Sequence, residues 1–147
     1  MNIGEFIDQI EQQRKEQDAI YHNVAVAYGL SDTAMWVLYF VSNSKEVCTQ
    51  HNLCQQSYYA KQTINTAITN LVKNGYVDLE LIPRNRNHKK ILLTPKGWEL
   101  AKNTTDHLRE AELRAYGRLN ESELREYLEM TTRLTMFLRE ETDKIIK

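Results

Sequence analysis

The sequence has few of the features that would place a protein outside the cell or in a membrane. Its two cysteines, Cys48 and Cys54, provide no disulfide framework and are typical of a reducing compartment. The longest uninterrupted apolar run, Ala34–Val41, is far shorter than the ~18 residues of a membrane span. The opening segment MNIGEFIDQIEQQRKEQ contains no apolar core of a secretion signal. These absences predict a cytoplasmic protein with no membrane partner.

Residue patterns of an active site are also absent from the sequence. It has no glycine-rich phosphate loop, no nucleophile and base at a recognisable spacing, and no carboxylate cluster beyond those expected on solvated helices. Its four histidines are scattered along the chain. We therefore expect a protein that is not an enzyme and that carries no cofactor.

Cys48, His51 and Cys54 are spaced three residues apart, which raises the question of a metal site. Steps of three turn progressively around a helix, and the two cysteines would lie ~9 Å apart along its axis. That separation exceeds the ~7 Å limit for the Cα atoms of a disulfide, unless Cys48 lies in non-helical chain before a cap at Thr49. We expect structural cysteines and no metal, and the sequence leaves a redox-sensing role of either thiol open.

Length and composition describe a single globular domain. The chain has 147 residues, of which 41% are hydrophobic and 27% are charged, so it can bury a core of its own. Apolar residues at helical spacing predict four helices in its first half, at residues 2–27, 32–43, 50–56 and within 58–77. Gly29 and Gly75 are suited to end the first and fourth of these helices, whereas Ser31 or Asp32 and Thr49 are suited to cap the second and third.

The hydrophobic period then changes from helical to alternating. Val77, Leu79 and Leu81 alternate with acidic residues, which indicates a half-buried strand that ends at Pro83. The polar, basic segment 83–90 is predicted to be a loop, and the alternation resumes at residues 91–93, which completes a two-stranded hairpin. Thr94-Pro95 starts a helical pattern that continues to the end of the chain. A break is predicted at 116–123, where Gly117 ends one helix and Asn120 or Ser122 caps the next.

Charge is distributed unevenly, although the net charge is only −1. This near-neutral balance argues against a generic nucleic-acid binder. Residues 57–98, however, contain 7 basic and 2 acidic residues, whereas residues 1–56 contain 3 and 7 and residues 99–147 contain 9 and 11. The middle of the chain therefore carries positive potential that suits an anionic partner, although such a run is also common on a simply solvated face.

The fourth predicted helix separates apolar from polar residues. Its apolar stripe is expected in the core and comprises Ile64, Ala67, Ile68, Leu71 and Val72. The opposite face carries amides and hydroxyls, with no acidic residue between Lys61 and Lys73. Amide side chains can pair with adenine in the major groove of DNA, which is about 12 Å wide and admits a helix. We predict that this face reads bases, with an ordinary solvated helix as the alternative. The predicted contacts are Lys61, Gln62, Thr63, Asn65 and Thr66.

The order of these elements is that of a winged helix-turn-helix. A short helix, a tight turn, a second helix with a polar face and a basic hairpin follow one another. Basic side chains on such a hairpin suit phosphates or a narrow minor groove, and simple solubilising charge is the alternative. The candidates are Arg84, Arg86, Lys89 and Lys90. The predicted fold is mainly α with a small β-hairpin (α+β), in the order α-α-α-α-β-β-α-α.

Three stretches resemble the MarR family (multiple antibiotic resistance regulator) of transcription factors. They are GLSDTAMWVLYFV, TQHNLCQQSYYAKQTINTAITNLVKNGYVDLE and ILLTPKGWELA. The last is similar to the leucine-threonine-x-x-glycine motif that opens the family's helix after the wing. The resemblance covers nearly the whole chain. It implies a homodimer with interlocked terminal helices that represses a pseudo-palindromic operator. It also implies release by a small phenolic or other lipophilic effector, or by cysteine oxidation in some branches.

Two positions depart from the family pattern. Asn85-Arg86-Asn87 stands where family wings commonly have aspartate-x-arginine, so the carboxylate that would brace an arginine is missing. Ala60 stands where the recognition helix usually has a capping serine, which predicts a less firmly anchored helix start. Both departures concern individual contacts and leave the architecture unchanged.

The predicted organisation is one domain, residues 1–147. Residues 31–98 form its winged-helix DNA-binding core, and residues 1–28 and 99–147 form dimerisation helices. Apolar residues on these helices would leave an exposed patch on a monomer. They are Ile3, Phe6, Ile7, Ile10, Leu124, Leu128, Leu134 and Leu138. Two recognition helices related by a two-fold axis would meet half-sites about 10 base pairs apart, which we expect to contain adenine and thymine.

Two functions from different classes remain open at this point. The first is a dimeric, sequence-specific regulator whose partner is double-stranded DNA. The second is a winged-helix protein–protein interaction module, because a fold does not determine a function. The polar helix and the basic wing favour DNA, whereas the acidic flanks favour the module. Four residues that could line an effector pocket, or simply belong to the core, are His22, Tyr28, Trp36 and Tyr39.

Overall fold

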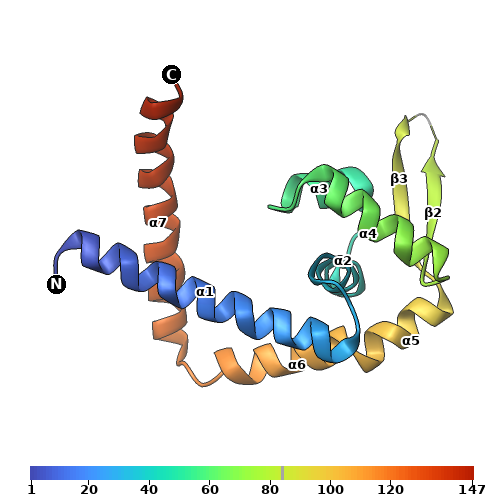
Figure 1. The fold of residues 1–147 in the computed structure, drawn as a ribbon, viewed down its shortest axis with the longest axis horizontal. Helices are drawn as coiled ribbons and strands as arrows, with labels where there is room; N and C mark the ends of the chain where they lie inside the picture. Colours follow the sequence, from blue (N-terminus) through green and yellow to red (C-terminus); the bar gives the residue numbers. More distant parts are fainter. Residues whose placement is uncertain (84) are drawn as a thin grey trace. The chain divides into compact units, whose positions relative to one another are not determined.

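The computed structural model describes the backbone of residues 1–83 and 85–147, and the side chains of all of these except 85–87. The fold is mainly α-helical with one small antiparallel sheet (Figure 1), which confirms the predicted fold class. Its elements are α1 (Ile3–Tyr28), α2 (Asp32–Asn43), β1 (Cys48–Thr49), α3 (Gln50–Gln56), α4 (Lys61–Lys73), β2 (Val77–Ile82), β3 (Asn85–Leu93), α5 (Pro95–Asn103), α6 (Thr105–Tyr116) and α7 (Glu121–Ile146).

The chain divides into two compact units, Met1–Arg109 and Glu110–Lys147. The division of the chain into a DNA-binding core and dimerisation helices remains a prediction, since it concerns function. In the part of the chain that the structure describes, no single helix is long and apolar enough to cross a membrane. Helices α1 and α2, bent by 88° at their junction, pass that test only as a pair, by length and composition.

Local capping explains where the helices of the first unit begin and end. Gly29 ends α1 in the left-handed conformation, with φ of 70°. The Ser31 hydroxyl accepts a hydrogen bond from the Ala34 amide at 3.1 Å, so Ser31 rather than Asp32 caps α2. Thr49 caps α3 in the same way, since its hydroxyl accepts from the Asn52 amide at 3.0 Å.

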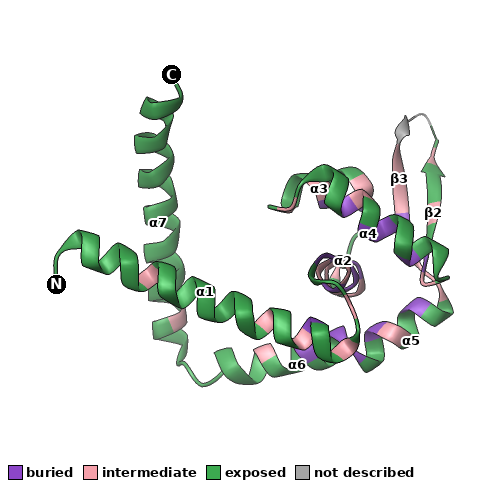
Figure 2. Cartoon of the chain, in the orientation of Figure 1, coloured by how far each residue is buried: buried purple, intermediate pink, exposed green. Residues whose placement is uncertain are grey.

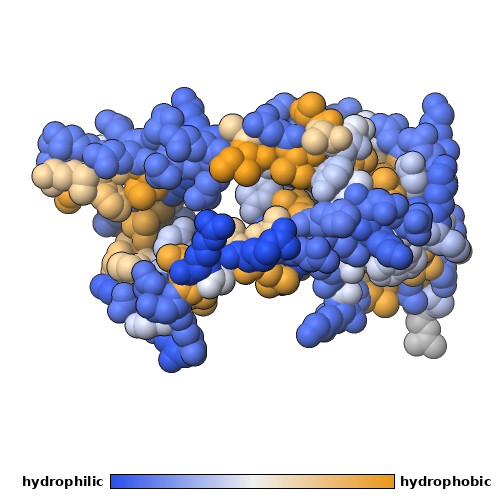
Figure 3. Space-filling view, turned by 90° about the horizontal axis from the view of Figure 1, so that it is seen from below, coloured by the Kyte–Doolittle hydropathy of each residue, from blue (hydrophilic) through white to orange (hydrophobic). Residues whose placement is uncertain are grey.

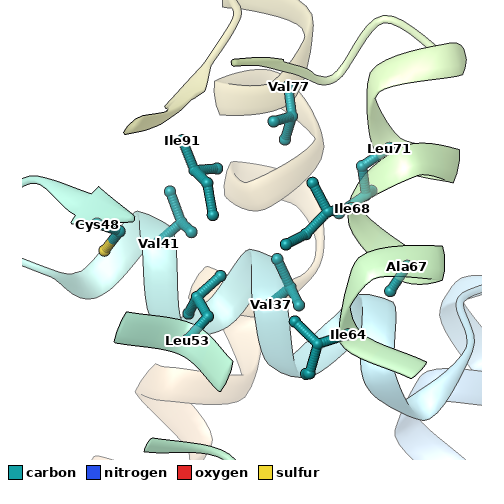
Figure 4. Close-up of a cluster of buried hydrophobic side chains, with 10 residues drawn as sticks. All are labelled: Val37, Val41, Cys48, Leu53, Ile64, Ala67, Ile68, Leu71, Val77 and Ile91. Carbon is teal, nitrogen blue, oxygen red and sulfur yellow. The ribbon is translucent and has the colours of Figure 1, made fainter. Parts of the chain in front are cut away.

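The main core lies between α2, α3, α4 and the sheet (Figure 4). Its buried members are Val37, Val41, Cys48, Leu53, Ile64, Ala67, Ile68, Leu71, Val77 and Ile91. Four of the five predicted core residues of α4 are buried, but Val72 is 37% exposed and its prediction was wrong. It lies furthest round the helix from Ala67, at the margin of the apolar stripe. Figure 2 shows the burial concentrated on the inner sides of these elements.

The sheet has three strands in the order β1-β3-β2, whereas the sequence predicted a two-stranded hairpin. The missed strand β1 has two residues, and Cys48 pairs with Ile91 more than 40 positions away, so no local pattern indicates it. The prediction of a loop at residues 83–90 is also wrong for residues 85–90, because these form the first part of β3. These residues pair with β2 although they are polar. A strand with no apolar residues shows no alternation of hydrophobicity, so the sequence pattern does not indicate it.

The start of α5 explains the leucine-threonine-x-x-glycine motif. The Thr94 hydroxyl caps the helix by accepting from the Gly97 amide at 3.0 Å, and it donates to the Gly75 carbonyl at 2.6 Å. At Gly97 a Cβ atom would collide with the carbonyl oxygen of Tyr76. The motif therefore places the first turn of α5 directly against the chain that leaves α4.

The predicted helical segment after Pro95 contains one more break than expected. Helix α5 ends at Asn103, and α6 begins after Thr104, whose φ and ψ are −132° and −84°. The observed element order is therefore α-α-β-α-α-β-β-α-α-α. The second predicted break is confirmed, since α6 ends at Tyr116 and Asn120 caps α7 through a capping box with Glu123. No residue of α7 is buried within this chain.

Candidate nucleic-acid interface

The exposed face of α4 presents a continuous polar surface. A shallow hollow of about 480 Å³ on this face is lined by Lys61, Gln62, Asn65, Thr66, Thr69 and Asn70. Four of the five predicted base-reading residues are therefore brought together, while Thr63 is exposed but does not line the hollow. The opposite face is held in the core by Ile64 and Ile68, so α4 presents its polar residues as a rigid row.

The hydroxyl groups of this face are partly committed to the helix itself. The Thr66 hydroxyl donates to the Gln62 carbonyl at 2.9 Å, and the Thr69 hydroxyl donates to the Asn65 carbonyl at 2.8 Å. Because each hydroxyl has one proton, these two side chains offer a partner only acceptor lone pairs and a methyl group. They are suited to the amino groups of adenine or cytosine and to the methyl group of thymine.

Asn65 is held from the side of α3. The Cys54 thiol lies 3.9 Å from the Asn65 side-chain oxygen, to which it can donate a weak hydrogen bond. Cys54 itself is half-buried against the core, and Cys48, buried in β1, lies ahead of the Thr49 cap, outside any helix. Among the described residues, no group of three or more histidine, cysteine or acidic side chains is placed to hold a metal ion.

The two ends of α4 are anchored very differently. Its N-cap, Ala60, makes no side-chain hydrogen bond to the helix, which confirms the missing cap predicted from the sequence. At the other end, Gly75 takes a left-handed φ of 80°, and the Lys96 ammonium donates to the Asn74 carbonyl at 2.8 Å. The same ammonium lies 4.7 Å from the centre of the Tyr76 ring, a cation–π contact. The helix is therefore fixed at its C-terminal end by α5.

A second hollow lies between α3 and α4. This groove, of about 530 Å³, is lined by Gln50, His51, Cys54, Gln55, Lys61 and Asn65. The His51 ring also stacks on the His88 ring of β3, with centroids 4.3 Å apart and planes 14° from parallel. The sequence analysis did not predict Gln50, Gln55 or His88 as site residues. The two stacked residues are 37 positions apart in the sequence, so no local pattern predicts their contact. The only signal in the sequence was that His51 lies in α3, the helix before α4.

The predicted wing residues are only partly described. Lys89 and Lys90 are half-exposed on β3, where they pair with Leu81 and Glu80 of β2. Because neighbouring residues of a strand point to opposite faces, these two lysines do not face one partner together. Arg84 and the side chain of Arg86 lie outside the described residues, so their predicted contacts remain predictions.

The aromatic residues near the junction of α1 and α2 have partners of their own. His22 lies 2.8 Å from the Asp32 carboxylate, and the Tyr39 hydroxyl accepts from Arg109 at 3.0 Å. Trp36 stacks on Phe40 with centroids 5.3 Å apart and meets the ring of Tyr59 edge-on at 6.4 Å. Burial raises the pKa of Tyr59, and the neighbouring Tyr58 and Asp32 raise it further.

Comparison with known proteins finds similarity to one family, in part of the sequence and in the fold. The model of the MarR family matches residues 28–86, somewhat less than half of the sequence. A MarR-family regulator from Neisseria meningitidis has a TM-score of 0.82 at 16% identity, with 98% of this chain and 99% of that chain covered. AbsC, a MarR-family regulator from Streptomyces coelicolor, has a TM-score of 0.73 at 17% identity, with 95% and 97% covered.

A third similar structure is that of MepR from S. aureus in its DNA-binding conformation. It has a TM-score of 0.72 at 16% identity, with 94% of this chain and 99% of that chain covered. No protein of curated function matches the sequence significantly. At these identities the solved structures establish the fold, and the family match from Tyr28 to Arg86 spans α2 to the start of β3. Proteins of this family are generally non-enzymatic regulators. Over residues 28–86 by sequence and over nearly the whole chain by fold, this protein is similar to winged helix-turn-helix proteins of the MarR family.

Proposed function

We propose that this protein is a cytoplasmic, sequence-specific transcriptional regulator that binds DNA as a homodimer and represses a pseudo-palindromic operator. The observation that carries the proposal is the exposed face of α4, where six polar side chains and no carboxylate line one hollow. Such a face can read base edges in the major groove, whereas an ordinary solvated helix would mix both signs of charge. The similarity in fold to MepR in its DNA-binding conformation supports this function.

The dimer is supported by apolar side chains that each unit leaves exposed. In the first unit Ile3, Phe6 and Ile7 are 80%, 46% and 54% exposed. In the second unit Leu128, Leu134 and Leu138 are 66%, 45% and 51% exposed. Ile10 of the first unit and Leu124 of the second are half-buried. Figure 3 shows apolar side chains gathered in patches among polar ones. Contiguous apolar surface of this kind marks an interface, and a second copy of the chain would cover it.

Release from DNA by a small lipophilic effector is a further part of the proposal. Of the four residues considered for it, His22, Trp36 and Tyr39 contact neighbours inside the first unit, and Tyr28 is half-buried. A compound that displaces one of these contacts could shift the position of α2 against α1. Adding small phenols to the protein bound to DNA tests this, since release at a concentration that leaves the fold intact is the expected result.

One experiment tests the central proposal. Genomic fragments that bind the purified protein are selected, and the affinities of the selected fragments are measured across a range of salt concentrations. We expect a two-fold symmetric motif, with half-sites about 10 base pairs apart, and a steep fall of affinity with salt as phosphate contacts are lost. Weak binding with no motif would contradict the proposal and would favour a protein–protein interaction module instead.

A further inference from the structure

Asn65 lies where the two hollows beside α4 meet. Like Lys61, it lines both the hollow on the exposed face of α4 and the groove between α3 and α4. Its side chain is half-buried, whereas those of Gln62 and Thr66 on the same face are exposed. A side chain that is partly buried has fewer rotamers open to it. The direction in which its amide is turned therefore decides what Asn65 can offer to a base.

The Cys54 thiol sets the direction of this amide. Cys54 of α3 packs against the main core, and its sulfur lies 3.9 Å from the Asn65 side-chain oxygen. The thiol has one proton to donate, so the amide oxygen is the acceptor of a weak hydrogen bond. The buried Leu53 holds α3 in the core, which keeps the sulfur in place. The amide oxygen is thereby turned toward α3.

The NH2 group of the Asn65 amide is left for a partner. It is bonded to the same carbon as the oxygen and is therefore turned away from Cys54. It forms no hydrogen bond within the part of the chain that the structure describes. An asparagine pairs with adenine by presenting its oxygen and its NH2 group together. With its oxygen turned to α3, Asn65 presents only a donor.

A lone donor distinguishes two classes of base in the major groove. Guanine and thymine present a keto oxygen there, whereas adenine and cytosine present an amino group. The NH2 group of Asn65 can donate to either keto oxygen. Opposite an amino group, two donors would face each other, and a donor left without an acceptor in a closed interface costs free energy.

Resting on the proposed DNA-binding function, we infer that Cys54 is a positioning residue that makes Asn65 a reader of guanine or thymine instead of adenine. The hydroxyls beside it are complementary, because Thr66 and Thr69 offer acceptors and suit amino groups. The α4 face therefore carries a donor at Asn65 and acceptors at the two threonines. This pattern specifies which strand of a base pair carries the keto base.

The test measures binding of the parent protein to its selected motif with each of the four base pairs placed at every position of a half-site. Asn65→Ala should remove the preference at one position, which identifies the base that Asn65 reads. At that position the two base pairs with guanine or thymine on one strand should bind about equally. They should bind about fivefold better than the other two, the lower end of the range for a base contact. An Asn65 that reads adenine would instead favour a single base pair.

Variants of Cys54 test the role of the thiol proton. Cys54→Val is close in size but has no proton to donate, and Cys54→Ala removes the same proton without adding bulk. In both, the amide can turn over, so the shared preference for guanine and thymine should give way to one base pair that contains adenine. Cys54→Ser keeps a donor and should keep the parent's preference. Adding Cys54→Val to Asn65→Ala should change nothing further at this position.

Cys48→Val is the matched control. The Cys48 thiol also lies 3.9 Å from an oxygen, the Glu46 carbonyl, but Cys48 is buried in β1 and lines neither hollow. This variant should keep the base preference of the parent, and urea unfolding curves check the fold of every variant. A parent that prefers a single base pair at the Asn65 position, or Cys54 variants without a donor that keep the parent's preference, overturn the inference alone. A parent that selects no motif overturns the regulator function and the inference together.

Discussion

Single residues of α4 differ in what they can offer to a partner. Thr66 and Thr69 have already used their only protons on helix carbonyls, and Asn65 is held at its oxygen by the Cys54 thiol. Gln62, exposed in the first turn, has both a donor and an acceptor in the geometry that pairs with adenine. We therefore assign it the largest share of sequence discrimination.

Replacing Gln62 by alanine should change which sequences are preferred. We expect a loss of about 1–3 kcal/mol on the selected motif and little loss on unrelated DNA, because a base contact is removed. Lys89→Ala should instead weaken all sequences alike and reduce the salt slope by about 1. Competition binding against fragments with single base changes measures both effects. If both variants bind as the parent does, the assignment of this face and wing is wrong.

Gly97 is a position at which adding a single methyl group should strongly destabilise the fold. A Cβ atom there meets the backbone carbonyl of Tyr76, which cannot move without shifting the junction of α4 and β2. Gly97→Ala should lower the free energy of unfolding by about 3 kcal/mol, as measured by urea denaturation. Gly4→Ala is the control, because its new Cβ approaches only one atom, the Oδ1 of the N-cap Asn2 at 3.3 Å, and meets no backbone. This variant should change the free energy of unfolding by less than about 1 kcal/mol.

Individual elements show what a local pattern can and cannot predict. Helix α4 could be predicted with its polar face, because apolar residues at helical spacing leave one side for the core. Strand β1 and the first half of β3 could not, because they exist only through pairing with distant chain. The same limit applies to the candidate site: the row on α4 was predicted, whereas the His51–His88 stack depends on a tertiary contact.

The unequal anchoring of α4 leads to a prediction about its first turn. Ala60 has φ of −61° and ψ of 145°, the extended conformation of an N-cap, but no side chain that can accept a hydrogen bond. Ala60→Ser should supply that acceptor and raise the free energy of unfolding by about 1 kcal/mol. Ala111→Ser, within α6 and exposed, is the control and should be slightly destabilising. An unchanged urea midpoint for Ala60→Ser would show that these amides already have other partners.

The whole molecule leaves more apolar surface exposed than a lone chain is expected to have. Helix α7 has no buried residue, although leucines recur along it at Leu124, Leu128, Leu134 and Leu138. The first unit likewise leaves the apolar residues near the start of α1 exposed. Both observations are explained if these helices form an interface between two copies of the chain.

Sedimentation should therefore show a dimer at micromolar concentration. Replacing Leu134 and Leu138 together by glutamate should produce monomers and abolish binding to the two-fold motif, because charge is unfavourable in an apolar interface. Met136→Glu is the matched control: Met136 is 51% exposed, but helical geometry places it away from both leucines. A parent protein that sediments as a monomer would rule out the dimer.

The position of Trp36 beside the start of α4 also gives the protein an intrinsic fluorescence signal for that region. The chain has two tryptophans, of which Trp98 is 53% exposed, whereas Trp36 packs on Phe40 and meets Tyr59, the residue before the N-cap Ala60. In a Trp98→Phe variant, all indole emission would come from Trp36. Its wavelength and its excitation transfer from Tyr59 should change when the turn before α4 moves. Binding could then be followed in real time without attaching a dye to the protein or to the nucleic acid.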